Sequence, residues 1–310
     1  MKVVVTNRTG FTKEMCQPIA DAGFELLYHE DEKGTPFTEE EKQCEVLWMH
    51  NAFSFNDLNE FPNLKLVCAA MMGLDVQPVE EFHQRGITFC NARNVYDIPI
   101  AEFVMMRLLE MKKRAYEFEQ QKREHRWEQL RLLGRINQQK AAVLGTGGIG
   151  GQIAKRLWAF GADITGYNRS GRTKEYFHRV HIIDHLAEEI GQYDLIAIAL
   201  PKDDSTVNLF NKDLMSKMKP TACFINVGRG GVVNEDDLYD ILKEGKIAAA
   251  ALDVYTQEPL SPECKLLELP NFYFSPHNSY SSEDNDEVMF AWMMENLLNY
   301  REGKPIKNVV

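Results

Sequence analysis

The chain has 310 residues, of which 44% are hydrophobic and 26% are charged. This balance is typical of a soluble globular protein and excludes a disordered or fibrous chain, and the length favours two domains. With 35 basic and 46 acidic residues, the net charge is -11. An acidic surface argues against nucleic acid or an anionic membrane as the main partner.

Further features of the composition bear on where the protein resides. The longest apolar runs, such as Leu195–Leu200, are far shorter than the ~20 residues of a membrane-spanning helix. The opening segment, Met1–Thr6, predicts a β-strand rather than a signal peptide. The cysteines are scattered, and none forms a C-x-x-C pair. Scattered thiols are typical of a reducing compartment, so we predict a cytoplasmic protein with inert cysteines.

Apolar strands alternate with helical stretches from the beginning of the chain. Short strands are predicted at Val3–Thr6, Glu25–Tyr28, Val46–Met49, Leu64–Ala70 and Ile87–Asn91. Helices are predicted between them at Lys13–Ala22, Glu39–Cys44 and Val76–Gln84. A longer helix is predicted to begin at Pro99, because proline in the first turn of a helix loses no hydrogen bond.

A second series of strands and helices starts at Ala141. Its strands are predicted at Ala141–Gly145, Asp163–Asn168, Leu195–Leu200, Ala222–Val227, Ala248–Val254 and Phe272–Ser275. These strands are continuously apolar, which is typical of a parallel sheet covered by helices on both faces. A last helix is predicted from Glu283 to Tyr300. The sequence therefore predicts an α/β protein with doubly wound parallel sheets.

A glycine-rich loop lies directly between the strand that starts at Ala141 and the next helix. It consists of Gly145, Thr146, Gly147, Gly148, Ile149 and Gly150, which is a G-x-G-x-x-G pattern. The first glycine allows a tight turn, the second lets the backbone approach a pyrophosphate, and the third lets helix and strand pack closely. In this setting the pattern favours a dinucleotide-binding site over a structural turn.

The residues after the next strand bear on which dinucleotide binds. Asn168 lies where an acidic residue would hold the adenosine ribose of NAD. Asn168 does not repel a 2′-phosphate, Arg169 can pair with one, and Ser170 adds a donor. We therefore predict NADP(H) in preference to NAD(H), which is left open as the second choice. The alternative is a solvated loop with ordinary charges.

Three ionisable residues, Arg229, Glu258 and His277, each follow an apolar strand of the second series. Ligands of open α/β sheets bind beyond the carboxyl ends of the strands, so these side chains can converge beside the dinucleotide. The alternatives are that Arg229 is a surface charge, that Glu258 caps a turn, and that His277 has a structural role.

The sequence also contains a group of histidines, which invites a metal interpretation. We reject a metal site at His178, His181 and His185 and predict no metal. Asp184 is predicted to cap the helix that holds His185, which would leave the other two outside that helix.

The segments just described resemble the D-isomer-specific 2-hydroxyacid dehydrogenase family over nearly the whole chain. The most specific matches are the glycine loop, Phe224–Gly231 (F-I-N-V-G-R-G-G), Asp253–Leu260 (D-V-Y-T-Q-E-P-L) and S-P-H at 275–277. The resemblance implies a flavodoxin-like substrate domain at 1–98 and 281–310. It also implies a Rossmann cofactor domain at 99–280, with a cleft between the two. The implied reaction is hydride transfer between a nicotinamide cofactor and C2 of a 2-oxo acid, which yields a D-2-hydroxy acid.

The same resemblance implies roles for individual residues. Arg229 would bind the carboxylate or carbonyl of the acid, His277 would give its proton to the nascent alkoxide, and Glu258 would fix the His277 ring. The backbone N–H groups of Met72 and Gly73 would hold the substrate carboxylate. Asp253 would face the nicotinamide amide, and Asn226–Gly228 would line the nicotinamide ribose. Besides these residues, the glycine loop and 168–170, the implied cofactor contacts are Leu200, Pro201 and His277.

The substrate and the assembly are less closely defined. A large apolar pocket is predicted from Trp48, Met71, Met72 and Tyr280. Glyoxylate, hydroxypyruvate, phenylpyruvate and branched 2-oxo acids all remain open as substrates. Relatives dimerise through the region that corresponds to residues 100–139, so we predict a homodimer in which Trp127 is a candidate to approach the partner's active site.

A dinucleotide-sensing corepressor of the same fold is the alternative function, and the absence of long tails favours an enzyme.

Overall fold

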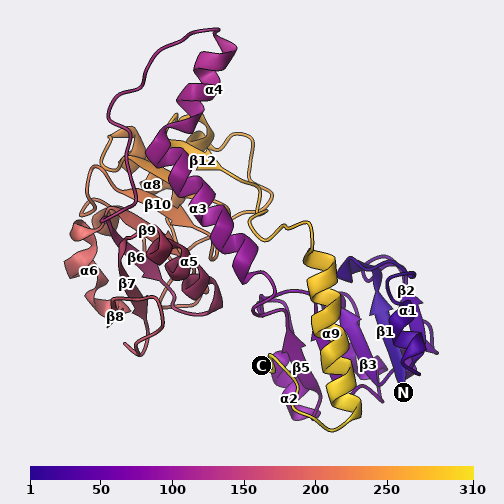
Figure 1. The fold of residues 1–310 in the computed structure, drawn as a ribbon. Helices are drawn as coiled ribbons and strands as arrows, with labels where there is room; N and C mark the ends of the chain where they lie inside the picture. Colours follow the sequence, from indigo (N-terminus) through magenta and orange to yellow (C-terminus); the bar gives the residue numbers. More distant parts are fainter. The chain divides into compact units, whose positions relative to one another are not determined.

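The computed structural model describes residues 1–310, which divide into two compact units. Unit 1 consists of Met1–Tyr96 and Ser282–Val310, and unit 2 is Asp97–Ser281. Each unit contains one parallel sheet flanked by helices (Figure 1). The predicted fold class of two doubly wound parallel sheets is confirmed.

Unit 1 is built on a 5-stranded sheet in the order β2-β1-β3-β4-β5, which is the order of flavodoxin-like folds. The strands are β1 (Lys2–Thr6), β2 (Glu25–His29), β3 (Val46–Met49), β4 (Leu66–Ala69) and β5 (Thr88–Asn91). The helices are α1 (Gln17–Asp21), α2 (Val79–Gln84) and α9 (Asn285–Arg301). Every residue of β3 and β4 is buried, as expected for central strands covered on both faces.

Helix α9, from the far end of the chain, completes the core of unit 1. Its apolar residues pack with the buried side chains of β1, β3 and β4; they are Met289, Trp292, Met293 and Leu297. Trp48 of β3 is fully buried there, in edge-to-face contact with Phe11 and Phe290. The expectation that Trp48 lines a substrate pocket is therefore wrong, because this face of β3 lies in the core.

The helices predicted in unit 1 are shorter in the structure, the first two most of all. The segment predicted as a helix at Lys13–Ala22 forms α1 only from Gln17, with Pro18 in its first turn. The segment at Glu39–Cys44 contains a single 3-10 turn, Glu41–Gln43. Glu41 accepts a hydrogen bond from the Thr38 N–H at 2.7 Å, which stabilises this turn without extending it.

Unit 2 is built on a 7-stranded sheet in the order β12-β11-β10-β9-β6-β7-β8. This is the Rossmann order with one added strand, β12. The strands are β6 (Lys140–Leu144), β7 (Asp163–Asn168), β8 (Arg179–Ile182), β9 (Leu195–Ile198), β10 (Cys223–Asn226), β11 (Ala249–Leu252) and β12 (Phe272–Phe274). The helices are α3 (Asp97–Lys113), α4 (Ala115–Arg123), α5 (Gly148–Ala159), α6 (Leu186–Glu189), α7 (Lys212–Met215) and α8 (Glu235–Lys243).

Strand β8 is an element that the sequence pattern does not reveal. It pairs in parallel with β7 at the edge of the sheet, and none of its residues is fully buried. It runs directly into a 3-10 turn at Ile183–His185, with Ile182 at the N-cap position. The prediction of Asp184 as a helix cap is therefore wrong, because Asp184 lies inside this turn.

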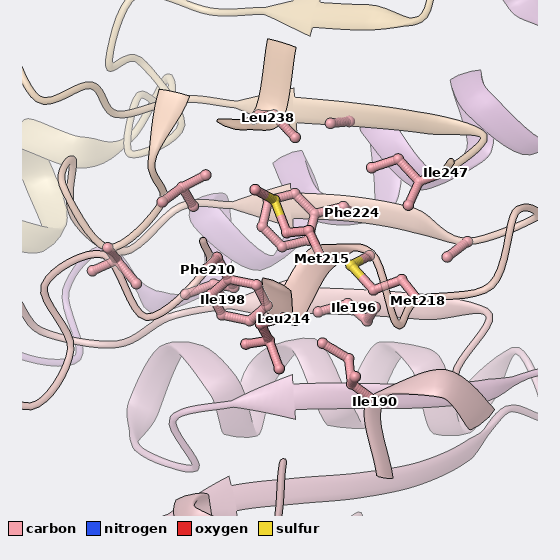
Figure 2. Close-up of a cluster of buried hydrophobic side chains, with 14 of the residues drawn as sticks. Ile190, Ile196, Ile198, Phe210, Leu214, Met215, Met218, Phe224, Leu238 and Ile247 are labelled. Carbon is pink, nitrogen blue, oxygen red and sulfur yellow. The ribbon is translucent and has the colours of Figure 1, made fainter. Parts of the chain in front are cut away.

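The largest core of unit 2 lies on one face of its sheet (Figure 2). Ile198 of β9 and Phe224 of β10 pack there against Phe210, Met215 of α7 and Leu238 of α8. Burial of each such side chain stabilises the fold by about 1.5–3 kcal/mol. This packing holds the central strands in place, and therefore also the loops at their carboxyl ends.

No helix in the structure is both long enough and apolar enough to cross a membrane.

Candidate functional site

The glycine loop follows β6 where the strand order of unit 2 reverses, between β6 and β9. Open α/β sheets bind ligands at such a point. A Cβ atom on Gly145 would lie 2.5 Å from the carbonyl oxygen of Ala199, and one on Gly150 would lie 1.7 Å from that of Gly145. A Cβ atom on Gly147 would meet nothing within 4 Å. The first and third glycines therefore allow close packing, and Gly147 leaves the backbone open to approach.

Helix α5 begins directly after this turn, and its N-cap residue, Gly147, provides no capping side chain. The first N–H groups of a helix have no partner within the helix, and the helix dipole favours an anion there. Gly148, Ile149 and Gly150 form the first turn of α5 and lie next to Thr146 in sequence. The residues present thus fit the pyrophosphate of a dinucleotide.

At the end of β7, the side chain of Asn168 organises its own loop. Its Oδ1 atom accepts hydrogen bonds from the N–H groups of Ser170 and Gly171, at 2.9 and 2.6 Å. Its Nδ2 atom donates to Oγ1 of Thr146 at 2.8 Å, which ties this loop to the glycine turn. Asn168, Ser170 and Thr146 are therefore brought together as a structural unit.

Arg169 extends from the same loop, is 74% exposed and forms an ion pair with Asp203. Asp203 lies in the loop after β9, and sequence reasoning did not identify it. The available signal was the run Asp203–Thr206, since aspartate followed by serine or threonine is typical of a turn at a strand end.

The loops after β9 and β10 are in direct backbone contact. A Cβ atom on Gly228 would lie 2.5 Å from the carbonyl oxygen of Leu200, which precedes Pro201. Asn226 is buried, accepts a hydrogen bond from the Gly228 N–H at 3.0 Å and donates one to the Arg229 carbonyl at 3.0 Å. These bonds shape the turn, which includes the buried Val227 and presents Arg229. A contact between Asn226 and a cofactor ribose stays a prediction.

The turn of Arg229 packs against the segment that carries Glu258. A Cβ atom on Gly230 would lie 1.8 Å from the carbonyl oxygen of Tyr255. The Tyr255 N–H donates to Oε1 of Glu258 at 2.9 Å, and Oε2 of Glu258 accepts a hydrogen bond from Nδ1 of His277 at 2.7 Å. The structure thus pairs Glu258 with His277 and connects that pair, through backbone contacts, to the turn of Arg229.

His277 itself has a left-handed backbone conformation, with a φ of 50°. Few residues other than glycine adopt this conformation, although histidine tolerates it better than most. The His277 N–H donates to the carbonyl of Asp253 at 2.8 Å, which holds the residue in place.

Asp253 holds the whole segment on which His277 lies. Asp253 is 1% exposed, and its carboxylate accepts hydrogen bonds from the Ser275 hydroxyl at 2.7 Å, the Asn278 N–H at 2.9 Å and the Ser279 N–H at 3.1 Å. The structure therefore shows that Asp253 holds this segment in place. A contact between Asp253 and the nicotinamide amide stays a prediction.

The predicted substrate-binding backbone of Met72 and Gly73 lies in unit 1, after β4. Asn91 donates a hydrogen bond to the Met72 carbonyl at 2.8 Å, and the Tyr96 hydroxyl donates to the Ala70 carbonyl at 3.2 Å. These bonds hold the segment in shape. The contact of Met72 and Gly73 with a carboxylate stays a prediction.

The histidines near β8 have contacts of their own. Nδ1 of His178 accepts a hydrogen bond from the Ile164 N–H at 3.0 Å, and Nδ1 of His181 lies 2.8 Å from Glu189. The structure contains no group of three or more His, Cys, Asp or Glu residues that could hold a metal ion.

The strand order and the glycine turn are those of a dinucleotide-binding domain, and the same unit contains the Glu258–His277 pair. Residues 105–279 match the model of the D-isomer specific 2-hydroxyacid dehydrogenase, NAD binding domain. The chain belongs to this family of oxidoreductases.

Relatives and solved structures agree with this assignment. The chain is 35% identical to human glyoxylate reductase/hydroxypyruvate reductase over 249 residues, which are 79% of this chain and 76% of that protein. It is 31% identical to D-3-phosphoglycerate dehydrogenase of Archaeoglobus fulgidus over 80% of this chain, and spans about half (47%) of that protein.

Among solved structures, an NADPH-dependent glyoxylate/hydroxypyruvate reductase from Sinorhizobium meliloti, in complex with NADP and malonate, is 27% identical with a TM-score of 0.80. The match covers 100% of this chain and 96% of that one. These relatives do not favour a corepressor-like function.

Proposed function

We propose that the protein reduces a small 2-oxo acid to a D-2-hydroxy acid and prefers NADP(H) as its cofactor. The observation that carries this proposal is the 2.7 Å hydrogen bond between Nδ1 of His277 and Glu258, beside the turn that presents Arg229. Two of the relatives are named for glyoxylate and hydroxypyruvate, so these acids are the first substrates to test. Phenylpyruvate and branched 2-oxo acids complete the panel.

The residues of this chain have distinct tasks in the proposed reaction. When bound, the nicotinamide cofactor supplies the hydride to C2 of the acid. Arg229 binds the carboxylate or carbonyl through its planar guanidinium. Glu258 engages Nδ1 of His277, so that Nε2 is the nitrogen that gives a proton to the substrate oxygen. In the oxidative direction Nε2 takes this proton back.

The test of this proposal is the loss of NADPH absorbance with each acid in turn, for the wild-type protein and two variants. We expect His277→Asn and Arg229→Ala each to reduce turnover by about two to four orders of magnitude. Dinucleotide affinity, measured by fluorescence titration, should change little. The control is His185→Asn, an exposed histidine outside the site. Full turnover in both site variants would contradict the mechanism.

We propose the cofactor preference because no acid stands at position 168 and Arg169 is exposed. Arg169→Ala should reduce the ratio of the NADH and NADPH dissociation constants by about threefold to tenfold, since the variant loses a charge-assisted contact to phosphate. Equal affinity of the wild-type protein for both dinucleotides would contradict the preference.

We also propose a homodimer that covers the region of α4 and the segment after it. Trp127 and Leu132 are 96% and 98% exposed, and Tyr116 and Phe118 of α4 are exposed as well. Large exposed apolar side chains within one stretch of the chain favour a contact with a partner, and a second copy of this chain is the proposed partner. A sedimentation measurement that finds only monomer at micromolar concentration would contradict the dimer, and with it any approach of Trp127 to a partner's site.

A cytoplasmic location is proposed from the cysteines. All of them are unpaired, and Cys16, Cys44, Cys68, Cys90 and Cys223 are buried. Free thiols persist in a reducing compartment. Fractionation of the source cells with an antibody to the chain tests this location.

A further inference from the structure

We propose that Asp203 is a specificity-determining residue that weakens the preference for NADP(H) by holding Arg169. This inference rests on the proposed dinucleotide site. Asp203 follows β9 and Arg169 follows β7, and these two strands are the neighbours of β6 in the sheet. The two loops therefore lie on either side of the glycine turn, and the Arg169–Asp203 ion pair joins them.

The carboxylate of Asp203 is fixed in place by its own turn. Its Oδ1 atom accepts hydrogen bonds from the N–H of Ser205 at 2.9 Å and from the Ser205 hydroxyl at 2.5 Å. The Asp203 N–H donates to Oγ1 of Thr206 at 2.8 Å. The second carboxylate oxygen, Oδ2, pairs with Arg169. The turn thus presents one fixed oxygen to the guanidinium.

Asp203 is also ionised at neutral pH. The hydrogen bonds from Ser205 hold the pKa of this carboxyl below its usual value, and the guanidinium of Arg169 lowers it further. A fixed negative charge therefore stands at the place where Arg169 would meet a 2′-phosphate. Since Arg169 is largely exposed, its pairing with Asp203 is weak enough for another anion to compete.

The two dinucleotides would respond to this charge in opposite ways. A 2′-phosphate has to displace Asp203 from Arg169 and is repelled by the carboxylate that it displaces. A ribose 2′-hydroxyl, in contrast, can donate a hydrogen bond to a carboxylate. In NAD-binding folds an acid at the end of the second strand performs this task. Here that position is Asn168, whose side chain is engaged within its own loop, and Asp203 supplies the acid from the other side.

The chain offers a matched pair of variants to test this inference. Asp203→Asn removes the charge but keeps an oxygen that can accept the Ser205 hydrogen bonds. Asp204→Asn removes the same charge from the next residue, which is exposed. The dissociation constants of NADPH and NADH are measured by isothermal titration calorimetry on the full chain, without substrate.

We expect Asp203→Asn to raise the ratio of the NADH and NADPH dissociation constants by about fivefold to tenfold, as for removal of one nearby like charge. Asp204→Asn should change this ratio by about twofold at most, because exposed charges further away are screened. In an Arg169→Ala background, Asp203→Asn should raise this ratio by a smaller factor, because there is no guanidinium that the loss of Asp203 could free to bind the phosphate. An undiminished effect there would overturn the role of Arg169.

Equal ratios in Asp203→Asn and Asp204→Asn would overturn the inference. Failure of the wild-type protein to bind either dinucleotide would instead overturn the proposed function, so the two failures are distinguishable. If Asp203→Asn lowers the melting temperature, Asp203→Ser gives the same comparison, because its hydroxyl can also cap the turn.

Discussion

Asp253 illustrates how a buried carboxylate that need not touch a substrate can hold in place the segment that contains His277, the proposed proton donor. Its oxygens accept hydrogen bonds from Ser275, Asn278 and Ser279, so the segment around His277 is anchored on both sides. A buried charge of this kind is stable only while it is hydrogen-bonded. The left-handed backbone of His277 lies between these anchors in the sequence.

Asp253→Asn is expected to lower kcat by about tenfold to a hundredfold, because small misplacements of a catalytic group are costly. The pH profile of kcat should change as well, since the ring of His277 moves relative to Glu258. Measurement of kcat against pH and of the NADPH dissociation constant separates two roles. A loss of NADPH affinity with an unchanged pH profile would favour a nicotinamide contact over positioning.

The proposed proton-donor role of His277 sets the direction of the pH dependence. A reaction that takes up a proton from a side chain should slow with rising pH, so the rate of reduction should decline, whereas the rate of oxidation should show the opposite trend. The rates of both reactions, measured from pH 5 to 10, test this expectation. A reduction rate that increases with pH would contradict the proton-donor role.

For single residues, the sequence predicts which residue types stand at strand ends better than it predicts their hydrogen-bond and ion-pair partners. The sequence motifs identify Glu258 and His277 as candidate site residues, and the structure shows the hydrogen bond between them. The Arg169–Asp203 pair joins two loops from strands that are not adjacent in the sheet, so no local pattern could indicate it. Likewise, the sequence does not show that the side chain of Asn168 is occupied within its own loop.

At the scale of elements, Asp194 ties together the starts of the central strands of unit 2. Its carboxylate accepts hydrogen bonds from the Lys140 N–H at 3.0 Å and from Nζ of Lys219 at 2.7 Å. Its carbonyl accepts one from the Cys223 N–H at 3.0 Å. Burial alone raises the pKa of Asp194, but its hydrogen bonds with Lys219 and Lys140 outweigh this effect and leave the pKa below its usual value.

Because the pKa of Asp194 is lower in the folded state, its charge stabilises the fold above the unfolded pKa of about 3.9. This stabilisation is lost as the pH falls through the folded pKa. We expect Asp194→Asn to lower the free energy of unfolding by about 1–2 kcal/mol at pH 7, with a smaller difference near pH 3. Urea denaturation at both pH values measures this, with the exposed Glu263→Gln as the control. A difference that grows with acidity would contradict the expectation.

The physical reason why some elements are predictable and others are not lies in their burial. Strands β3, β9 and β10 are buried on both faces, so their apolar runs are unbroken and reveal them. Strand β8 contains an arginine and a histidine and is nowhere fully buried, so its sequence resembles that of a loop. Short helices such as α1 and the turn at Glu41–Gln43 depend on local hydrogen bonds, which periodicity does not show.

At the scale of the whole molecule, unit 1 is made from both ends of the chain. Deletion of residues 282–310 removes α9, and with it the cover over β1, β3 and β4. Exposure of such a face costs far more than the few kcal/mol by which domains are stable. We therefore expect the shortened chain to lose the fold of unit 1 while unit 2 persists. Limited proteolysis should then leave a fragment near Asp97–Ser281, and equal resistance of both units would contradict this.

The return of α9 to the first unit also affects how the protein is made. Domains generally fold in the order in which the ribosome releases them, but here the nascent N-terminal strands lack their covering helix until α9 (Asn285–Arg301) has been translated. Unit 2 emerges complete while the first sheet still exposes an apolar face. Until α9 is made, this apolar face makes the nascent chain prone to aggregation, and it is a defined surface that chaperones can bind.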